Sequence, residues 1–197
     1  MTISFFSTPE VLEAADGTAQ LVHGLAPIAV TAALCGPAAT CACPPGDNLA
    51  IHRLLAQAPE GSVLVVDAGS RTDCGHFGEL AGMDAENRGI QGLVIAGAIR
   101  DGGALAVLGF PVFHSGFAPS SCAKERAGSL NEPVTIGGIE IAPGDQVIAD
   151  SDAILVVSAT DWLAVAAGAQ AIREAENGLR TRLLQGTHLS ELLDLPE

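Results

Sequence analysis

Apolar residues fall into two patterns along the first half of the chain. Residues 62–68 (SVLVVDA) and 92–98 (GLVIAGA) are almost wholly apolar, as expected for parallel strands that are covered on both faces. Residues 28–34 are similar and predict a strand that ends before Gly36-Pro37. Residues 47–58 instead carry apolar positions at helical spacing after a polar start. These patterns predict strand–helix–strand units.

Local start and stop signals place further helices. Ser7-Thr8-Pro9-Glu10 combines a capping box with an early proline and predicts the start of a short helix. Another helix is expected to begin near Phe77. Thr160-Asp161 should start a long terminal helix that extends to Leu184 and stops at Gly186. A helical turn at 104–108 and a short helix at 188–193 complete the predicted helices.

The second half of the chain contains shorter strands. Residues 134–141 (VTIGGIEI) alternate on either side of Gly137-Gly138, which predicts a hairpin. Two more strands are expected, at 146–149 and 153–158. Strand–helix–strand units followed by hairpins predict an α/β fold with mixed parallel and antiparallel sheets. We expect one domain over residues 1–197, with a helical extension from about residue 160.

Composition narrows the classes of partner. The formal net charge is −14, which argues against binding to nucleic-acid phosphates or to an anionic membrane surface. One Trp, six Phe and no Tyr leave little surface for base stacking. No apolar run has membrane-spanning length without Gly, Pro or charge, and the start of the chain lacks a secretory pattern. We therefore expect a cytoplasmic protein with a small-molecule substrate.

Few residues offer nucleophilic or metal-binding chemistry. Lys124 is the one lysine, so it is the only candidate for a Schiff base, and a surface loop or ion pair explains it better. Five cysteines without paired spacing are expected to be buried or half-buried free thiols in a reducing cytosol. His52 and His114 are expected in the core or at its rim, and Asp47 and Asn48 as helix caps.

The segment from Gly78 to Asp101 is the strongest candidate for a site. Glu79 stands at a predicted helix start, and after twenty intervening residues Arg100-Asp101 follows a buried strand, before Gly102-Gly103. Taken singly, Glu79 could complement a helix dipole, and Arg100-Asp101 could be a surface ion pair. A helix followed by a returning strand can bring both ends of the segment together. The joint pattern therefore favours a functional site at a strand end.

These residues resemble the RraA-like family, which includes metal-dependent 4-hydroxy-4-methyl-2-oxoglutarate aldolases. The hallmark of that family is an acidic residue, twenty further positions and then Arg-Asp, as in Glu79 and Arg100-Asp101. Other parts of the chain are also similar, at 46–52, 63–69, 108–119 and 131–150. Residues 17–27 fit weakly, and Gln20 stands near the position where an acid is usual.

The resemblance implies a swivelling β/β/α domain that forms trimers or hexamers, with sites between subunits. It also implies Mg²⁺ or Mn²⁺ and cleavage of 4-hydroxy-2-oxo acids to pyruvate, with oxaloacetate decarboxylation alongside. Asp101 would hold the metal, Arg100 would bind the oxo oxygen, and Glu79 would orient a water for proton transfer. Gly78 and the backbone of Leu80 and Ala81 would bind the substrate carboxylate. Glu176 resembles a glutamate that reaches a neighbouring subunit, although a solvated helix face explains it equally well.

Two alternatives remain open at this point. The family also includes a non-enzymatic regulator that binds and inhibits a ribonuclease, but that regulator lacks the aspartate after the arginine, whereas Asp101 is present here. A lyase of similar mechanism that acts on another oxo acid is the second alternative. The divergent segment 17–27 leaves room for it.

Overall fold

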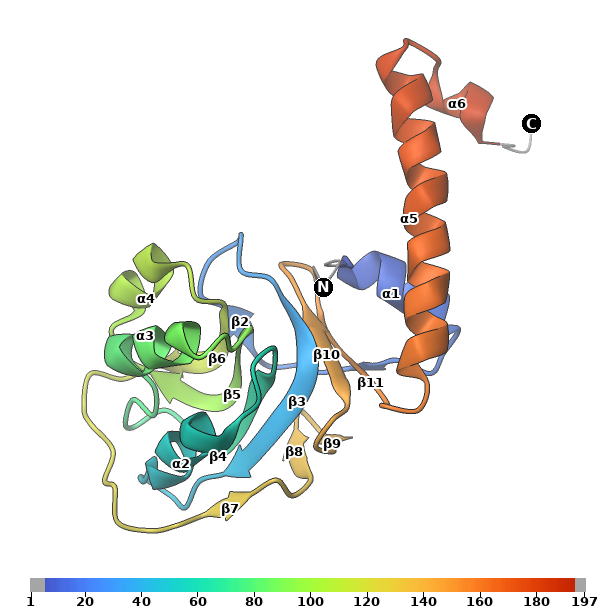
Figure 1. Ribbon diagram of the computed structural model, residues 1–197. Helices are drawn as coiled ribbons and strands as arrows, with labels where there is room; N and C mark the ends of the chain where they lie inside the picture. Colours follow the sequence, from blue (N-terminus) through green and yellow to red (C-terminus); the bar gives the residue numbers. More distant parts are fainter. Residues whose placement is uncertain (1–5, 194–197) are drawn as a thin grey trace.

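Four parallel strands form the centre of the molecule. The computed structural model describes residues 6–193, and Figure 1 shows their arrangement. The central strands are β3 (Leu34–Ala42), β4 (Val63–Arg71), β5 (Gly92–Ile99) and β6 (Val112–Phe117), adjacent in that order. The connections between them contain α2 (Leu49–Gln57), α3 (Glu79–Asn87) and α4 (Gly102–Leu108). The predicted strand–helix–strand units are thus confirmed.

Antiparallel strands extend this sheet on both sides. β10 (Gln146–Ala149) pairs with β3, and β11 (Ile154–Val157) pairs with β10. The short strands β1 (Gln20–Leu21), β2 (Ala26–Pro27) and β7 (Ser129–Leu130) pair with β11, β6 and β3 respectively. β8 (Val134–Ile136) and β9 (Ile139–Ile141) form the predicted hairpin. The chain therefore has the expected α/β fold with a mixed sheet.

The alternation of side chains along β4 shows how the layers form. Leu64 and Val66 belong to the core between the sheet and helices α2 and α3. Val63 and Val65 belong to the opposite core, which includes residues of the β8–β9 hairpin. All four side chains are fully buried, because a parallel strand in this position is covered on both faces. The β8–β9 hairpin, the main sheet and the helices therefore form three successive layers, which is the expected β/β/α arrangement.

Helices from the two ends of the chain pack together at the antiparallel side. α1 (Thr8–Ala15) has Ser7 as its N-cap with the predicted capping box, and it packs against α5 (Trp162–Leu184). Arg173 of α5 donates hydrogen bonds to both carboxylate oxygens of Glu10, which is buried. The C-terminal part of α5 stands clear of the body and leads to α6 (Leu189–Leu192) (Figure 1).

The prediction of a strand over residues 28–34 is wrong. The strand begins at Leu34 and passes through Gly36-Pro37, the predicted end of the strand. Proline is tolerated there because β10 pairs with residues 34–37, whereas pairing with β4 begins only at Ala38. Pro37 therefore has no partner strand on one side, and a missing N–H does not interrupt a ladder there.

The length and polarity of the helices bear on whether any of them could span a membrane. Among the helices of residues 6–193, none combines the length and the apolar character needed to cross a bilayer.

Candidate active site

The end of β5 lies against the loop that precedes α3. The backbone N–H of His76 donates to the carbonyl of Ala98, and the N–H of Arg100 donates to the carbonyl of Phe77, both at 2.8 Å. These two bonds fix the loop beside the strand end. As a result, the start of α3 and the end of β5 lie side by side, although about twenty positions separate them in the sequence.

The acidic and basic groups of the predicted motif meet at this point. Oδ2 of Asp101 lies 3.4 Å from Nε of Arg100 and accepts a hydrogen bond from the N–H of Glu79, also at 3.4 Å. The Arg100 and Asp101 side chains are 37% and 44% exposed, so both remain accessible to a ligand. Arg100 and Asp101 therefore meet at the backbone of Glu79, while the part of the Glu79 carboxylate in the site stays a prediction.

Gly78 makes this close approach possible. A Cβ atom at Gly78 would lie 2.6 Å from Oδ2 of Asp101 and 3.0 Å from both Cγ and Nε of Arg100. Contacts this short are not sustained by real side chains, so any larger residue would push the pair away. Residue 78 is therefore glycine because a side chain would have no room, and not because the backbone conformation requires it.

Asp101 adopts an uncommon backbone conformation. Its φ is +55° and its ψ is +33°, in the left-handed region, and it is the N-cap residue of α4 without a capping side-chain bond. Aspartate enters this region more readily than most residues, but the conformation still costs free energy. The carboxylate is thus turned toward α3 instead of capping its own helix.

A pocket of about 160 Å³ opens beside Arg100. Its wall includes four residues predicted to bind substrate, namely Gly78, Leu80, Ala81 and Arg100. None of the described residues that line it is acidic, whereas Arg100 and Lys124 are both basic. Asp101 faces a second hollow that shares Arg100 as a wall. In a chain of net charge −14, this local basic character suits a small anion.

The first turn of α3 adds hydrogen-bond donors to the pocket. The first intrahelical bond runs from the N–H of Gly82 to the carbonyl of Gly78. The amides of Leu80 and Ala81 precede it and so have no acceptor within the helix. A helix N-terminus of this kind favours a carboxylate.

Several residues of the pocket wall were not predicted as site residues. Ser121 accepts a 2.6 Å hydrogen bond from Nη1 of Arg100, and Lys124 follows it in the same loop. Asn48 makes no side-chain cap; its Nδ2 donates to the carbonyl of His76 at 2.8 Å and so supports the loop before α3. No sequence signal marked Ser121, because its role depends on a long-range contact between two loops.

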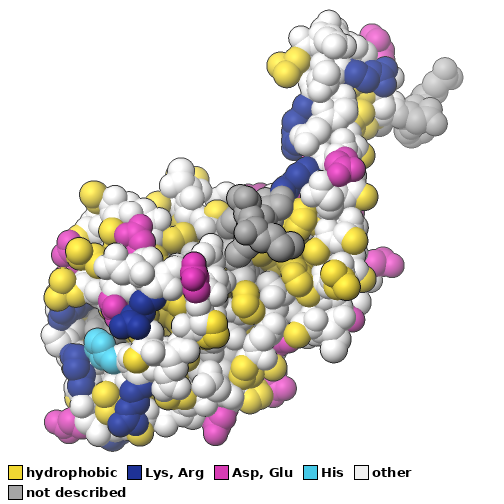
Figure 2. All heavy atoms as spheres, viewed as in Figure 1, with side chains coloured by type: hydrophobic (Ala, Val, Ile, Leu, Met, Phe, Trp, Pro, Cys, Tyr) yellow, Lys and Arg dark blue, Asp and Glu magenta, His cyan; other side chains and the backbone are white. Residues whose placement is uncertain are grey.

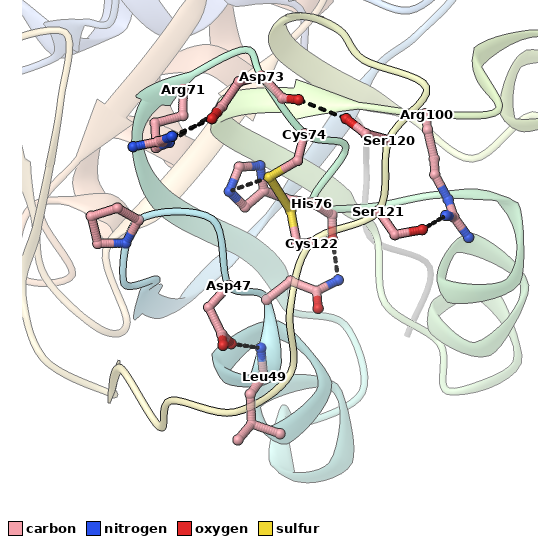
Figure 3. The surroundings of a disulfide bond; sticks show 12 residues. Asp47, Leu49, Arg71, Asp73, Cys74, His76, Arg100, Ser120, Ser121 and Cys122 are labelled. Atoms are coloured by element: carbon pink, nitrogen blue, oxygen red, sulfur yellow. Dashed lines mark hydrogen bonds and ion pairs between the residues drawn. A yellow bond between two sulfur atoms is a disulfide. The ribbon is translucent and has the colours of Figure 1, made fainter.

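The expectation that all five cysteines are free thiols is wrong. Cys74 and Cys122 form a disulfide, with their Cα atoms 5.5 Å apart, while Cys35, Cys41 and Cys43 are free. Figure 3 shows the bond between the loop before α3 and the loop that carries Ser121. Their separation of 48 residues gave no pairing signal, because only the fold places these loops together.

Burial lowers the pKa of two histidines near the pocket. His52 lies on α2 at the rim; partial burial and then the nearby Lys124 lower its pKa. Burial also lowers the pKa of His76. Figure 2 shows basic side chains gathered around a histidine between α2 and α3. His114 is buried, as predicted, with its ring against Phe117.

Glu176 does not join this site within the chain. It lies on α5 and accepts a 2.6 Å hydrogen bond from Nη2 of Arg180, one helical turn later. The helix packs against α1 beside the antiparallel strands β10 and β11, away from the pocket region (Figure 1). A role for Glu176 across a subunit boundary stays a prediction.

Comparisons with known proteins agree with this architecture. The model of the RraA-like family, described as Aldolase/RraA, matches residues 8–156. A protein of Halalkalibacterium halodurans, provisionally named 4-hydroxy-4-methyl-2-oxoglutarate aldolase, is 36% identical over 152 residues, covering 75% of this chain and 70% of that protein.

Solved structures show the same relationship. An uncharacterized protein from Pseudomonas syringae pv. tomato superposes with a TM-score of 0.79 at 25% identity, over 94% of this chain and 92% of the other. The RNA-processing inhibitor RraA from a Thermus species superposes with a TM-score of 0.69 at 25% identity, over 75% and 91%. Together with the match over residues 8–156, these likenesses establish that the chain belongs to the RraA-like family.

Proposed function

We propose that this protein is a divalent-metal-dependent carbon–carbon lyase that cleaves a 4-hydroxy-2-oxo acid to release pyruvate. Oxaloacetate decarboxylation is the expected accompanying activity. The observation that carries this proposal is the meeting of Arg100 with Asp101 and the α3 N-terminus, where Arg100 separates the basic pocket from the hollow that Asp101 lines. The provisional aldolase name of the Halalkalibacterium halodurans relative supports the same reaction class.

The surroundings of Asp101 fit a hard cation. The described residues make two polar contacts with its carboxylate, and both involve Oδ2, which leaves Oδ1 for a ligand. Mg²⁺ keeps several waters and needs only one or two protein carboxylates, so a single aspartate is sufficient. Mg²⁺ or Mn²⁺ held by Asp101 would act as a Lewis acid on the oxo acid.

The remaining groups bind the substrate and stabilise developing charge. The amides of Leu80 and Ala81 would hold the substrate carboxylate at the helix N-terminus. Breaking the bond between C3 and C4 leaves negative charge on the former oxo oxygen. The Arg100 guanidinium would hydrogen-bond that oxygen, and this bond strengthens as the charge grows. Glu79 would orient a water that carries protons between the 4-hydroxyl group and solvent.

Assembly belongs to the same proposal. α5 extends beyond the body, and Leu163, Leu183 and Leu184 are exposed on it. A trimer or hexamer would cover such apolar positions and could bring Glu176 to a neighbouring site. A cytoplasmic location also remains a prediction.

Pyruvate release provides the test. 4-Hydroxy-4-methyl-2-oxoglutarate, related 4-hydroxy-2-oxo acids and oxaloacetate should be screened with Mg²⁺, with Mn²⁺ and with chelator. Turnover should need the cation and should exceed the background rate of the cation alone. Full activity in chelator, or no turnover of any substrate in the panel, would count against the proposal.

A regulator is the second candidate, because the fold also matches an RNA-processing inhibitor. Direct binding of a purified ribonuclease to the metal-free protein, without turnover of any oxo acid, would favour it. The accessible carboxylate of Asp101 beside Arg100 favours the enzyme. A lyase for a different oxo acid would appear in the same substrate screen.

A further inference from the structure

Three buried side chains with metal-binding atoms meet in the wall of the pocket. Cys74, His76 and Cys122 each offer one ligand atom, and these atoms lie within 4.8 Å of one another. Their exposed fractions are 7%, 1% and 7%. This cluster has no part in the proposed cleavage reaction, and its donors are soft, unlike the carboxylate of Asp101.

The imidazole of His76 has almost no other partner. Nε2 faces Sγ of Cys74 at 3.9 Å, and Nδ1 is buried without a hydrogen-bond partner among the described residues. Buried polar atoms are normally hydrogen-bonded, so each exception calls for an explanation.

The geometry fits a small ion once the sulfur–sulfur bond is broken. Zinc lies about 2.3 Å from cysteine sulfur and about 2.1 Å from histidine nitrogen, so ligand atoms around it are roughly 3.5 Å apart. The two sulfur atoms would separate by rotation about their side-chain bonds, and the 3.9 Å between Sγ of Cys74 and Nε2 of His76 is already near this spacing. Figure 3 shows the His76 ring beside the disulfide, with its contact to Sγ of Cys74.

The cluster also leaves one coordination position open. His76 and Cys122 both line the pocket beside Arg100, so the fourth position would face its interior. Three protein ligands with an open fourth position are typical of zinc sites that bind a water or substrate, and two cysteines with one histidine are an established set. Asp73 directly precedes Cys74 in the chain, yet it does not belong to the cluster among the described residues.

We infer that Cys74, His76 and Cys122 form a site for a soft divalent cation such as Zn²⁺ in the reduced protein, with the disulfide as its oxidised, metal-free form. Two equivalents of a small-molecule thiol reduce the disulfide: the protein S–S bond breaks, two protein thiols form, and the reductant becomes a disulfide. Binding of the cation then releases one proton from each cysteine. Binding of Zn²⁺ here does not require the proposed lyase activity, although the cluster lines the same pocket.

Metal titration of the full chain tests the inference. Reduced protein, freed of reductant without air, should bind one Zn²⁺ in competition with a chromophoric chelator. Co²⁺ in its place should give a thiolate-to-metal charge-transfer band. The oxidised protein should neither bind Zn²⁺ in this competition nor give the charge-transfer band with Co²⁺. Cys122→Ser and His76→Gln should each weaken Zn²⁺ binding about 100-fold or more, since each removes a ligand.

Two controls separate this site from others in the chain. Cys43→Ser removes one of the free thiols outside the cluster and should leave Zn²⁺ binding unchanged, as should Asp101→Asn. Should a variant fail to fold, wild-type protein gives the answer: Zn²⁺ should protect Cys74 and Cys122 from alkylation, as identified by peptide mass spectrometry. Absence of Zn²⁺ binding by the reduced wild type, equal binding by Cys122→Ser, or protection of Cys41 and Cys43 instead would overturn the inference.

Discussion

Nη1 of Arg100 donates a 2.6 Å hydrogen bond to Oγ of Ser121 and thereby connects the end of β5 to the loop after β6. Arginine has several donors in a fixed plane, so holding one of them orients the others. Nε of the same guanidinium lies toward Asp101. The contact with Ser121 therefore positions Arg100 for a substrate without requiring Ser121 to touch it.

Ser121→Ala should lower kcat/KM for pyruvate release about fivefold. The lost bond involves a charged donor, but the residue is exposed, so water replaces part of the interaction. Steady-state kinetics measure the effect on catalysis, and the midpoint of unfolding measures the effect on stability. Ser121→Thr retains the hydroxyl group and should restore most of the rate; an inactive Thr variant with normal folding would contradict this role.

Asp101→Asn should lower metal-dependent turnover more than about 100-fold, because a ligand of the cation is lost. Folding should change little, since asparagine also tolerates the left-handed conformation at φ +55°. Kinetics over a range of Mn²⁺ concentrations, with thermal unfolding as the control, provide the measurement. Wild-type rates at low Mn²⁺ would rule out Asp101 as the ligand.

Gly78→Ala should reduce kcat/KM about 10-fold to 100-fold. The added Cβ would meet Oδ2 of Asp101 at 2.6 Å and must displace the pair, and small displacements of catalytic groups have effects of this size. Gly103→Ala is the matched control, because nothing lies within 4 Å of its added Cβ. Equal rates for the two variants would show that the close approach at Gly78 does not matter.

Glu10→Gln should destabilise the fold by about 3 kcal/mol. Hydrogen bonds from Arg173 to the buried carboxylate are the main reason that the pKa of Glu10 falls from 4.5 to about 2. The carboxylate therefore contributes stability above pH 4.5, and this contribution disappears as the pH falls from 4.5 toward 2.

Chemical denaturation at several pH values measures this contribution. The difference in free energy of unfolding between wild type and Glu10→Gln should shrink across that window. Glu13→Gln, at an exposed position of the same helix, should have almost no effect at any pH. A difference from wild type that stays constant with pH would show that the ion pair is not its source.

The sequence predicted most elements and the place of the site because these depend on local patterns. Uninterrupted apolar runs located β4 and β5, and the spacing from Glu79 to Arg100-Asp101 located the pocket edge. The start of β3 was misplaced because Pro37 looks like a turn residue until its neighbouring strands are known. Ser121 contacts Arg100 across 21 positions and the Cys74–Cys122 disulfide spans 48, and only the tertiary fold brings these residues together.

Binding of Mn²⁺ together with oxalate, a stable analogue of the pyruvate enolate, tests the central claim most directly. Electron paramagnetic resonance of free Mn²⁺ should show one bound ion per site in the wild type, with oxalate tightening the binding. Asp101→Asn should lose the ion, and Arg100→Ala should bind it without the gain from oxalate. Unchanged Mn²⁺ and oxalate binding in both variants would mean that the cation and the oxo acid are held elsewhere.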